Sequence, residues 1–440
     1  MRFIHTADWH LGNSLFNIDR TKEFEDFLNW LKEKIIETKA DALVIAGDVY
    51  DMANPPINSR KQYNKFLASL IGTSCKNVII VGGNHDSGAL LDSEKDILDM
   101  LNIHVVGSLN NIPPASIKDI VFEIKDENEN VIGLCCAVPY VREIELRNYY
   151  QDQVGKGELS DKAYKQLYQL VRKAAEKKAK GNPIPLIATG HLYASGLEGR
   201  FSNTEKEIRC DDGRRTIDDV IGNLGSVHVS VFPKEFSYVA LGHIHYTTMV
   251  AKNQNVRYSG SPFVLGFDEA NLPRFVLMVD VQPGKKTKVE KLEVPRFYKF
   301  ERISGRVKEI KETLRRYQKP EIPTFIELYY KKEDGLSIND YLAETILNLP
   351  EGVFVVNKKP QPTNQNNNSI YFDDIDNEEL KNLSPEEIFS NLILSKCKID
   401  TTGLSEKEIE KKQEALIKKY LPLFMEIAKE VEEGEVYENN

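Results

Sequence analysis

The stretch ALVIAGDVYD at residues 42–51 decides the fold of this chain. Its first five residues are apolar and too few for a free-standing helix, so they predict a buried strand. Gly47 then lets the backbone turn sharply, which leaves Asp48 at the carboxyl end of that strand. Ligand sites of α/β sheets lie at this edge, and a carboxylate there can bridge two divalent cations. Taken alone, a Gly-Asp pair after a strand is more often an ordinary turn, so the rest of the chain must decide.

Other predicted strands also end in polar side chains that can bind a metal. These strands and the residues after them are 2–6 with Asp8 and His10, 78–81 with Asn84, His85 and Asp86, 185–189 with His191, and 236–241 with His243 and His245. Five of the eight histidines fall in this set, although a residue such as Asp8 or His191 could by itself be a turn former or a surface histidine. The mixture of imidazole, carboxylate and amide suits Mn²⁺, Fe or Zn²⁺ better than Ca²⁺, which prefers oxygen ligands.

The first 284 residues alternate between predicted strands and helices. Helices are predicted over residues 20–39, from about residue 58, over 90–101 and over 161–180, and further strands near 103–106, 120–124, 131–138, 256–259 and 275–281. Strand–helix–strand alternation predicts a mostly parallel sheet that is covered on both faces, which is an α/β fold.

The pattern changes after residue 284, where three further regions are predicted. Strands at 297–303, 324–331 and 352–357, with helices at 307–317 and 338–347, predict a small α+β domain over residues 285–358. Residues 359–378 begin with a polar, Pro- and Asn-rich stretch and form a predicted linker. Two capped helices are predicted within residues 379–440, and the second has an apolar stripe that needs a partner.

Length and composition limit the class of protein. The chain has 440 residues, more than the roughly 250–300 at which a single core stops growing, so two or more domains are expected. It shows no signal peptide and no long apolar run, and its five cysteines lack zinc-site spacing, so we expect a cytoplasmic protein without a membrane segment. The net charge of −9 argues against a protein that coats nucleic acid by itself, but not against a local metal-lined cleft for phosphate.

Five short motifs follow one another along the chain. They are Asp-x-His at 8–10, Gly-Asp-x-x-Asp at 47–51, Gly-Asn-His-Asp at 83–86, Gly-His at 190–191 and Gly-His-x-His at 242–245. This order resembles the calcineurin-like metallophosphoesterases, and the stretches DWHLG, GNHDS, VALGHIH and YSGSP resemble the DNA nucleases of that family. The similarity is strong to about residue 268 and looser beyond it; the loop at 195–231 is hard to match and is given no role. The resemblance implies a metallophosphoesterase sandwich of sheets covered by helices, with a small α+β capping domain and C-terminal helices.

The resemblance also implies a role for each candidate residue. One divalent metal would be held by Asp8, His10, Asp48 and His245, and a second by Asp48, Asn84, His191 and His243, with Mn²⁺ the favoured ion. His85 would face the scissile phosphate as the catalytic histidine, to donate a proton to the leaving oxygen or to stabilise the charge of the transition state. Asp86 would orient the His85 ring.

The function implied by the family is hydrolysis of DNA. Its members act as 3′-to-5′ exonucleases on duplex ends and as endonucleases on single strands and hairpins, in DNA repair, recombination and replication. The terminal helices would grip a long coiled-coil ATPase, and a homodimer would form through the region that holds Tyr63, Phe66, Leu67, Leu70 and the predicted helix at 90–101, although those helices could simply cover the sheet.

Two other classes of function compete with the nuclease. The same fold serves stand-alone metallophosphatases and small-molecule phosphodiesterases, because fold alone does not fix the substrate. Protein phosphatases of this superfamily resemble Gly-Asp-x-Val-Asp-Arg-Gly and Gly-Asn-His-Glu, whereas this chain has Met52-Ala53 after Asp51, and Asp86 in place of Glu. A scaffold without catalytic activity does not fit an intact set of ligands.

Overall fold

The computed structural model describes residues 1–110, 112–149, 156–195, 197–198, 227–331, 337–361, 412 and 417–421. Most of the predicted loop at 195–231, most of the linker at 359–378 and nearly all of the helical region at 379–440 lie outside these residues. Among the described residues, no helix is both long and apolar enough to cross a membrane.

The first domain contains two large sheets and a small pair of strands, β8 and β10, and the first large sheet carries the stretch at 42–51. Its order is β15-β14-β1-β2-β3-β4. The strands from β1 to β4 run parallel, whereas β14 and β15 are antiparallel to their neighbours. Their bounds are β1 Arg2–Thr6, β2 Ala42–Ala46, β3 Asn77–Val81, β4 Ile103–Val106, β14 Phe275–Asp280 and β15 Lys288–Glu293.

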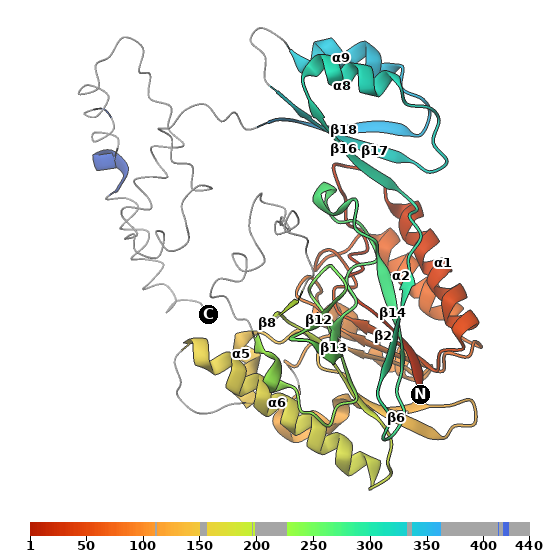
Figure 1. The fold of residues 1–440 in the computed structure, drawn as a ribbon. Coiled ribbons are helices and arrows are strands. Elements are labelled where there is room, and N and C mark those ends of the chain that lie inside the picture. The colour runs from red at the N-terminus through yellow and green to blue at the C-terminus, as the bar shows by residue number, and fades with distance from the viewer. Residues whose placement is uncertain are drawn as a thin grey trace. The chain divides into compact units, whose positions relative to one another are not determined.

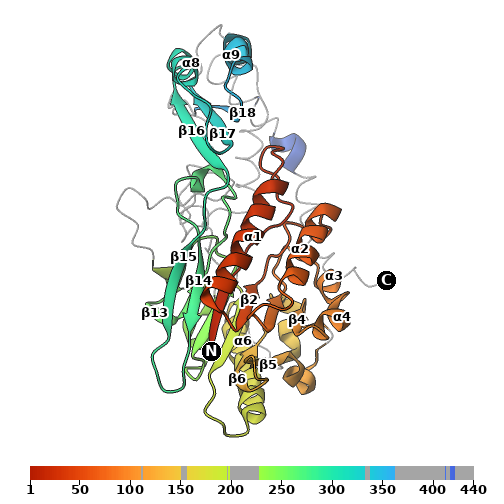
Figure 2. The same ribbon diagram turned by 90° about the vertical axis from the view of Figure 1, so that its right-hand side faces the viewer.

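Helices cover the outer face of this sheet (Figure 2). The apolar sides of α1 (Thr21–Thr38) and α2 (Ile57–Ser69) pack on it through side chains such as Phe27 and Phe66. The helix predicted at 90–101 is instead two short helices, α3 (Gly88–Asp92) and α4 (Lys95–Asp99). The Ser93 hydroxyl donates to the Leu90 carbonyl at the end of α3, and such local bonds compete with helix continuation.

The second sheet has the order β5-β6-β7-β11-β13-β12-β9, with β6, β7, β11 and β13 parallel. The two sheets pack face to face, because Val44 and Ile79 of the first share one apolar core with Ile187 and Leu241 of the second. The long helix α6 covers the outer face of the second sheet (Figure 1). The bounds are β5 Val121–Lys125, β6 Val131–Cys136, α5 Glu143–Leu146, α6 Lys156–Ala179, β7 Leu186–His191, β8 Ala194–Ser195, β9 Leu197–Glu198, β10 Val227–His228, β11 Tyr238–Gly242, β12 Thr248–Val250 and β13 Asn253–Tyr258.

This sandwich is the predicted metallophosphoesterase architecture, with one difference. Strand–helix alternation predicts one mostly parallel sheet with helices on both faces. In the structure there are two large sheets, and each is covered by helices on its outer face and by the other sheet on its inner face. The first domain also extends past residue 284, because β15 pairs with β14 along its whole length. The strand KVEKLE lies at the edge and is mostly exposed, so its many charged residues hide the strand pattern.

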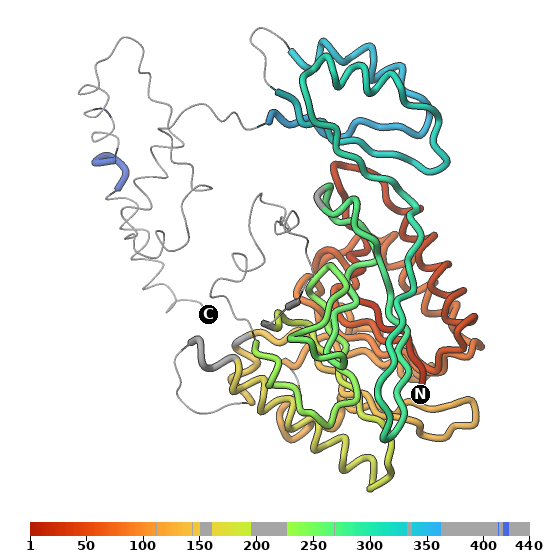
Figure 3. The backbone as a smooth tube through the Cα atoms, in the orientation of Figure 1, coloured from red at the N-terminus to blue at the C-terminus, as the bar shows by residue number. Residues whose placement is uncertain are grey.

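The small domain is an α+β unit, as predicted. Its three strands form a parallel sheet of order β16-β17-β18 with two helices packed on one face. Figure 3 shows the chain running from the β14–β15 hairpin into this domain. The bounds are β16 Lys299–Gly305, α8 Val307–Arg315, β17 Thr324–Tyr330, α9 Ile338–Leu347 and β18 Val353–Pro360.

The small domain contacts the first domain through a separate apolar cluster. Phe300 and Phe325, from β16 and β17, pack against Leu15, Ile18 and Phe267 of the first domain. The loop that holds Leu15 and Ile18 follows directly after the motif Asp8-x-His10, so the small domain lies against the segment that leaves the candidate site.

Candidate metal centre

All the predicted site residues meet where the two sheets come together. Asp8, Asp48 and Asn84 follow the parallel strands β1, β2 and β3, and His191 and His243 follow or end β7 and β11 of the second sheet. The two sheets are joined directly here, since His191 Nδ1 donates to the Ala46 carbonyl at 2.9 Å. The carboxyl ends of the strands thus form one site, as expected for sheets of this kind.

The backbone turns at these strand ends are strained. Asp8, His10, Asp48 and His243 have positive φ angles of 54°, 45°, 49° and 100°, in the left-handed region. Each costs a non-glycine residue about 1–3 kcal/mol and persists only where the surrounding structure enforces it. Backbone bonds do so here, because Asp8 N donates to the Gly47 carbonyl at 2.9 Å and His10 N to the Asp48 carbonyl at 3.0 Å.

Asp48 lies between two groups of ligand atoms. Its Oδ2 is 3.5 Å from His10 Nε2 on one side and 3.3 Å from His191 Nε2 on the other. On the His10 side, the ligand atoms of Asp8, His10 and His245 all lie within 4.8 Å of one another. The geometry therefore gives two adjacent groups of ligands with one carboxylate shared between them.

The second group is completed by Asn84. Its Oδ1 lies 3.0 Å from His191 Nε2 and 2.9 Å from His243 Nδ1. Because His191 Nδ1–H donates to a carbonyl, its Nε2 carries a lone pair when the ring is neutral. Burial opposes the charged ring, but Asp48 raises the pKa of His191 to about 9, so without a metal Nε2–H donates to Asn84 Oδ1. When that proton is lost, Nε2 and the oxygens of Asn84 and Asp48 form a set of ligands for a cation.

Buried ligand atoms without partners point to the same conclusion. Asp8 Oδ2 and His10 Nε2 are buried and have no hydrogen-bond partner among the described residues. An unpaired buried polar atom costs roughly 1–3 kcal/mol, which a bound cation would remove. The donor set of carboxylate, imidazole and amide oxygen fits a pair of divalent transition metals.

The charges of the site favour cations as well. Burial raises the pKa of Asp8 to about 7, so this carboxylate lacks a sufficient positive partner within the protein. Burial also opposes the ionised form of Asp48, but His191 and His10 hold its pKa below the ordinary value. Burial lowers the pKa of His243 to about 4, which leaves that ring neutral and free to bind a metal near pH 7.

His85 lies at the exposed rim of the site, beside the buried ligands. Its ring is 4.8 Å from the His10 ring between centroids, and its Nδ1 donates to the Asp51 carbonyl at 2.9 Å. The orienting contact that was predicted for Asp86 therefore comes from Asp51. The Asp86 carboxylate instead accepts hydrogen bonds from the backbone N–H groups of Gly83, Val49 and Tyr50 at 2.9–3.1 Å, and thereby holds two strand-end loops together.

Two glycines allow the ligands to approach this closely. A Cβ atom on Gly83 would lie 2.1 Å from Asp48 Oδ1, and one on Gly242 would lie 2.0 Å from the Ala46 carbonyl oxygen. Atoms cannot approach so closely, so the loop after β3 and the end of β11 can lie this near to β2 only because residues 83 and 242 have no side chain.

Sequence reasoning gives Asp51 a supporting place but not its partners, and it does not find Arg274. The Asp51 carboxylate accepts from His10 Nδ1 at 3.1 Å, and its spacing in Gly-Asp-x-x-Asp was the available signal, although no definite role was assigned to it. Arg274 Nη1 donates to the His245 carbonyl at 2.9 Å and Nη2 pairs with Glu269, which fixes the loop of that histidine. No local motif around Arg274 indicates such a contact.

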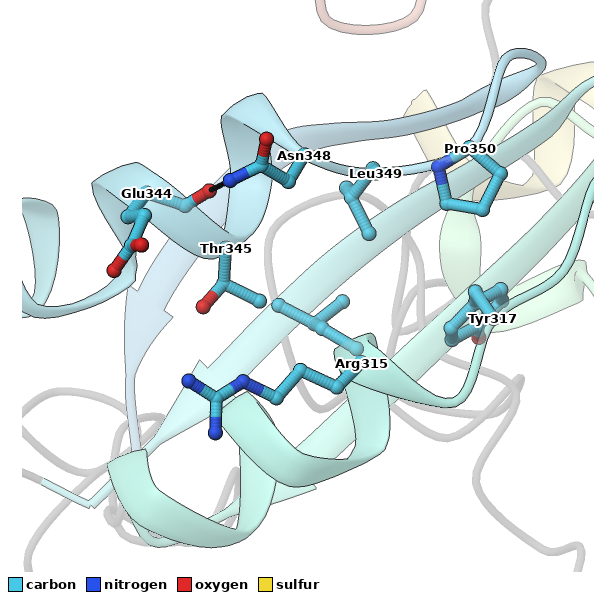
Figure 4. A pocket seen from close by; sticks show the side chains of 8 residues that line it. Arg315, Tyr317, Glu344, Thr345, Asn348, Leu349 and Pro350 are labelled. Carbon is cyan, nitrogen blue, oxygen red and sulfur yellow. Dashed lines mark hydrogen bonds between the residues drawn. The ribbon is translucent and has the colours of Figure 1, made fainter.

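The small domain also contains a hollow (Figure 4). It has a volume of about 210 Å³ and lies between α8 and α9, where Asn348 Nδ2 donates to the Glu344 carbonyl at 2.8 Å. Its lining contains a single carboxylate and no histidine, so it does not offer a metal site. The lining residues are Leu314, Arg315, Tyr317, Glu344, Thr345, Asn348, Leu349 and Pro350.

Comparison with known proteins agrees with this fold. Residues 1–247 match the calcineurin-like phosphoesterase family, and the chain belongs to that family. It is similar to the SbcD component of the SbcCD nuclease of Escherichia coli strain K12, with 30% identity over 399 residues, 89% of this chain and 92% of the relative. The SbcD components from Rhodobacter capsulatus and Bacillus subtilis are 30% and 28% identical over 64% and 65% of this chain, and 67% and 68% of their own lengths. Within the family, the chain is therefore of the SbcD type.

Proposed function

We propose that this protein is the nuclease component of an SbcCD-like complex and hydrolyses DNA phosphodiesters at a two-metal centre. The observation that carries the proposal is the position of Asp48 Oδ2 between His10 Nε2 and His191 Nε2, at 3.5 and 3.3 Å. The metals are two divalent ions; the ligand types suit Mn²⁺, Fe and Zn²⁺, and the family resemblance favours Mn²⁺ among them. The proposed activities are 3′-to-5′ exonuclease on duplex ends and endonuclease on single strands and hairpins, in DNA repair, recombination and replication.

The mechanism follows from the position of each side chain. Two bound divalent ions supply a water of lowered pKa and neutralise charge on the phosphate. Asp8, His10, Asp48 and His191, which would hold the ions, are buried, while Asn84 and His85 are exposed, so the substrate approaches from the rim. The Asp51 carbonyl accepts from His85 Nδ1–H, so the ring directs Nε2 away from that loop. As a water oxygen bonds to phosphorus and the bond to the 3′-oxygen breaks, protonated Nε2 donates its proton to that leaving oxygen.

The test of this function is cleavage of linear duplex DNA by the purified protein with Mn²⁺. The expected result is release of nucleotides from duplex ends and cleavage of a hairpin, with both activities lost in Asp48→Ala. If the protein hydrolyses small phosphate esters but leaves all DNA substrates intact, it is a phosphatase or small-molecule phosphodiesterase and the nuclease proposal is wrong.

The proposal includes a partner, an SbcC-like coiled-coil ATPase held by the predicted helices at 379–440. Support comes from the apolar stripe in that region and from the names of the relatives, which describe one component of a complex. Deletion of residues 384–440 should abolish capture of an SbcC-like protein and leave Mn²⁺-dependent cleavage and the Tm unchanged. Unfolding of the truncated protein, or unchanged capture, would exclude this arrangement.

A homodimer is proposed as well, with a changed set of contact residues. Tyr63, Phe66, Leu67 and Leu70 are buried in the core of the first domain, so they cannot form the interface. Ile57 of α2, Ile97 of α4 and the adjacent Met100 are 71%, 69% and 84% exposed and are available for one. Sedimentation at micromolar concentration should show a dimer for the wild type and a monomer for an Ile97→Asp, Met100→Asp double variant; a monomeric, active wild type would contradict the proposal.

A further inference from the structure

Asp51 connects the candidate metal centre to polar residues that lie outside it. Its Oδ1 accepts from His10 Nδ1 at 3.1 Å and from Asn13 Nδ2 at 3.1 Å. Its carbonyl oxygen accepts from His85 Nδ1 at 2.9 Å. One residue thus holds the ring of a candidate metal ligand and the ring of the candidate catalytic histidine, and Asn13 is a further side chain that restrains its carboxylate.

Arg20 restrains Asn13 in turn. Arg20 Nη1 donates to Asn13 Oδ1 at 2.8 Å, and Arg20 Nε donates to Glu23 at 2.6 Å. A guanidinium can only donate and an ionised carboxylate can only accept, so the side chain between Arg20 and Asp51 must do both. An amide meets this requirement, and its orientation is fixed, with oxygen toward Arg20 and nitrogen toward Asp51.

The other side of Arg20 faces the small domain. Its guanidinium carbon lies 5.4, 5.7 and 5.6 Å from the ring centres of Phe24, Phe263 and Phe300. The side chain is fully buried, and Nη2 has no hydrogen-bond partner among the described residues, so the rings are its surroundings. Cation–π contacts of this kind are strongest when the cation is shielded from water. Phe300 belongs to β16, so one of the three rings comes from the small domain.

We propose that Asn13 and Arg20 are positioning residues. They couple the packing of the small domain against the first domain to the ring orientations of His10 and His85. The path runs from Phe300 through Arg20 and Asn13 to Asp51. When Asn13 donates to Asp51 Oδ1, the carboxylate is held in the orientation that accepts from His10 Nδ1, and His10 Nε2 is then aimed at the metal. The inference rests on the proposed two-metal function.

The experiment compares four variants by Mn²⁺ titration, with bound and free Mn²⁺ distinguished by electron paramagnetic resonance. Asn13→Asp keeps an acceptor for Arg20 but cannot donate to Asp51, whereas Asn13→Ala loses both contacts. Phe300→Leu removes the ring from Arg20. Tyr298→Phe is the matched control, because the Tyr298 hydroxyl donates from the same segment to the Asp19 carbonyl at 3.2 Å and has no bond to Asn13.

Both Asn13 variants should weaken one of the two Mn²⁺ sites by about 10- to 100-fold and leave the other unchanged, as expected when the partner of a ligating histidine is removed. On a chromogenic phosphodiester at saturating Mn²⁺, kcat should fall with little change in KM. Phe300→Leu should act in the same direction by a smaller factor, and Tyr298→Phe should match the wild type. The Tm should fall more for Asn13→Ala than for Asn13→Asp.

The inference is overturned if the folded Asn13→Asp and Phe300→Leu variants bind two Mn²⁺ with wild-type affinities, or if Mn²⁺ affinity falls only in proportion to the Tm across all variants. Those outcomes would make Arg20 and Asn13 parts of the packing only. A wild-type protein that binds fewer than two Mn²⁺ would instead refute the two-metal function itself, so the two failures are distinguishable.

Discussion

Replacement of Gly83 by alanine tests how the site is assembled. The new Cβ would lie 2.1 Å from Asp48 Oδ1 and 2.3 Å from Asp48 N, where ordinary contacts begin at 3.4 Å. The loop after β3 and the end of β2 must therefore move apart by more than an ångström. Because Asp48 N is a backbone atom, no side-chain rotation can relieve the overlap.

The size of the effect follows from that displacement. Overpacking of a well-packed site costs about 1–3 kcal/mol, and each kcal/mol lowers the Tm of a domain this large by about 2–4 °C. Displacement of reacting groups by about 1 Å lowers the rate by about 100-fold. Gly83→Ala should therefore bind Mn²⁺ more weakly and lower kcat by about 100-fold or more while the protein still folds.

The assay is Mn²⁺ content after gel filtration, together with cleavage of duplex DNA and thermal unfolding. Gly72→Ala is the matched control, since no atom lies within 4 Å of its Cβ position and its positive φ of 83° costs only backbone strain. That variant should lose about 1–2 kcal/mol and keep both Mn²⁺ ions. A Gly83→Ala protein with full Mn²⁺ content and wild-type kcat would refute the close approach of the two loops.

Three further predictions concern the same site. His85→Ala should lower kcat on DNA by about 100-fold or more with both Mn²⁺ retained, and its assignment is wrong if the metals are lost as in Asp48→Ala. Asp86→Ala leaves three backbone N–H groups without their acceptor and should cost about 3 kcal/mol or more in urea unfolding; a loss under about 1 kcal/mol would contradict the loop-holding role. Removal of metal by EDTA should lower the Tm, and excess Mn²⁺ should restore about 4 kcal/mol at 1,000 times its Kd, whereas an unchanged Tm would show that the cluster binds no ion.

The sequence predicted the central strands and the site because both depend on local patterns. A short apolar run followed by glycine and a polar residue defines a strand end at β2, β3, β7 and β11, and β1 has Ala7 in place of the glycine. The strand β15 was missed because an exposed edge strand carries charged residues in place of an apolar pattern. The predicted helix at 90–101 breaks between α3 and α4, where the Ser93 hydroxyl donates to the Leu90 carbonyl, and the spacing of apolar residues gives no sign of that hydrogen bond.

The supporting contacts of the site could not be predicted, because they join residues that are distant in sequence. Asp51 lies 41 residues from His10, and Arg274 lies 29 residues from His245. The prediction for Asp86 assumed that a neighbour in sequence would orient the His85 ring. In the structure, the short turn directs the Asp86 carboxylate back to the backbone of both loops, where three N–H groups converge.

The most direct test of the two-metal centre is anomalous diffraction at the manganese edge from crystals grown with Mn²⁺. We predict two anomalous peaks about 3.5–4 Å apart, one beside Asp8, His10 and His245, the other beside Asn84, His191 and His243, with Asp48 Oδ2 between them. A single peak, or two peaks without Asp48 between them, would contradict the account.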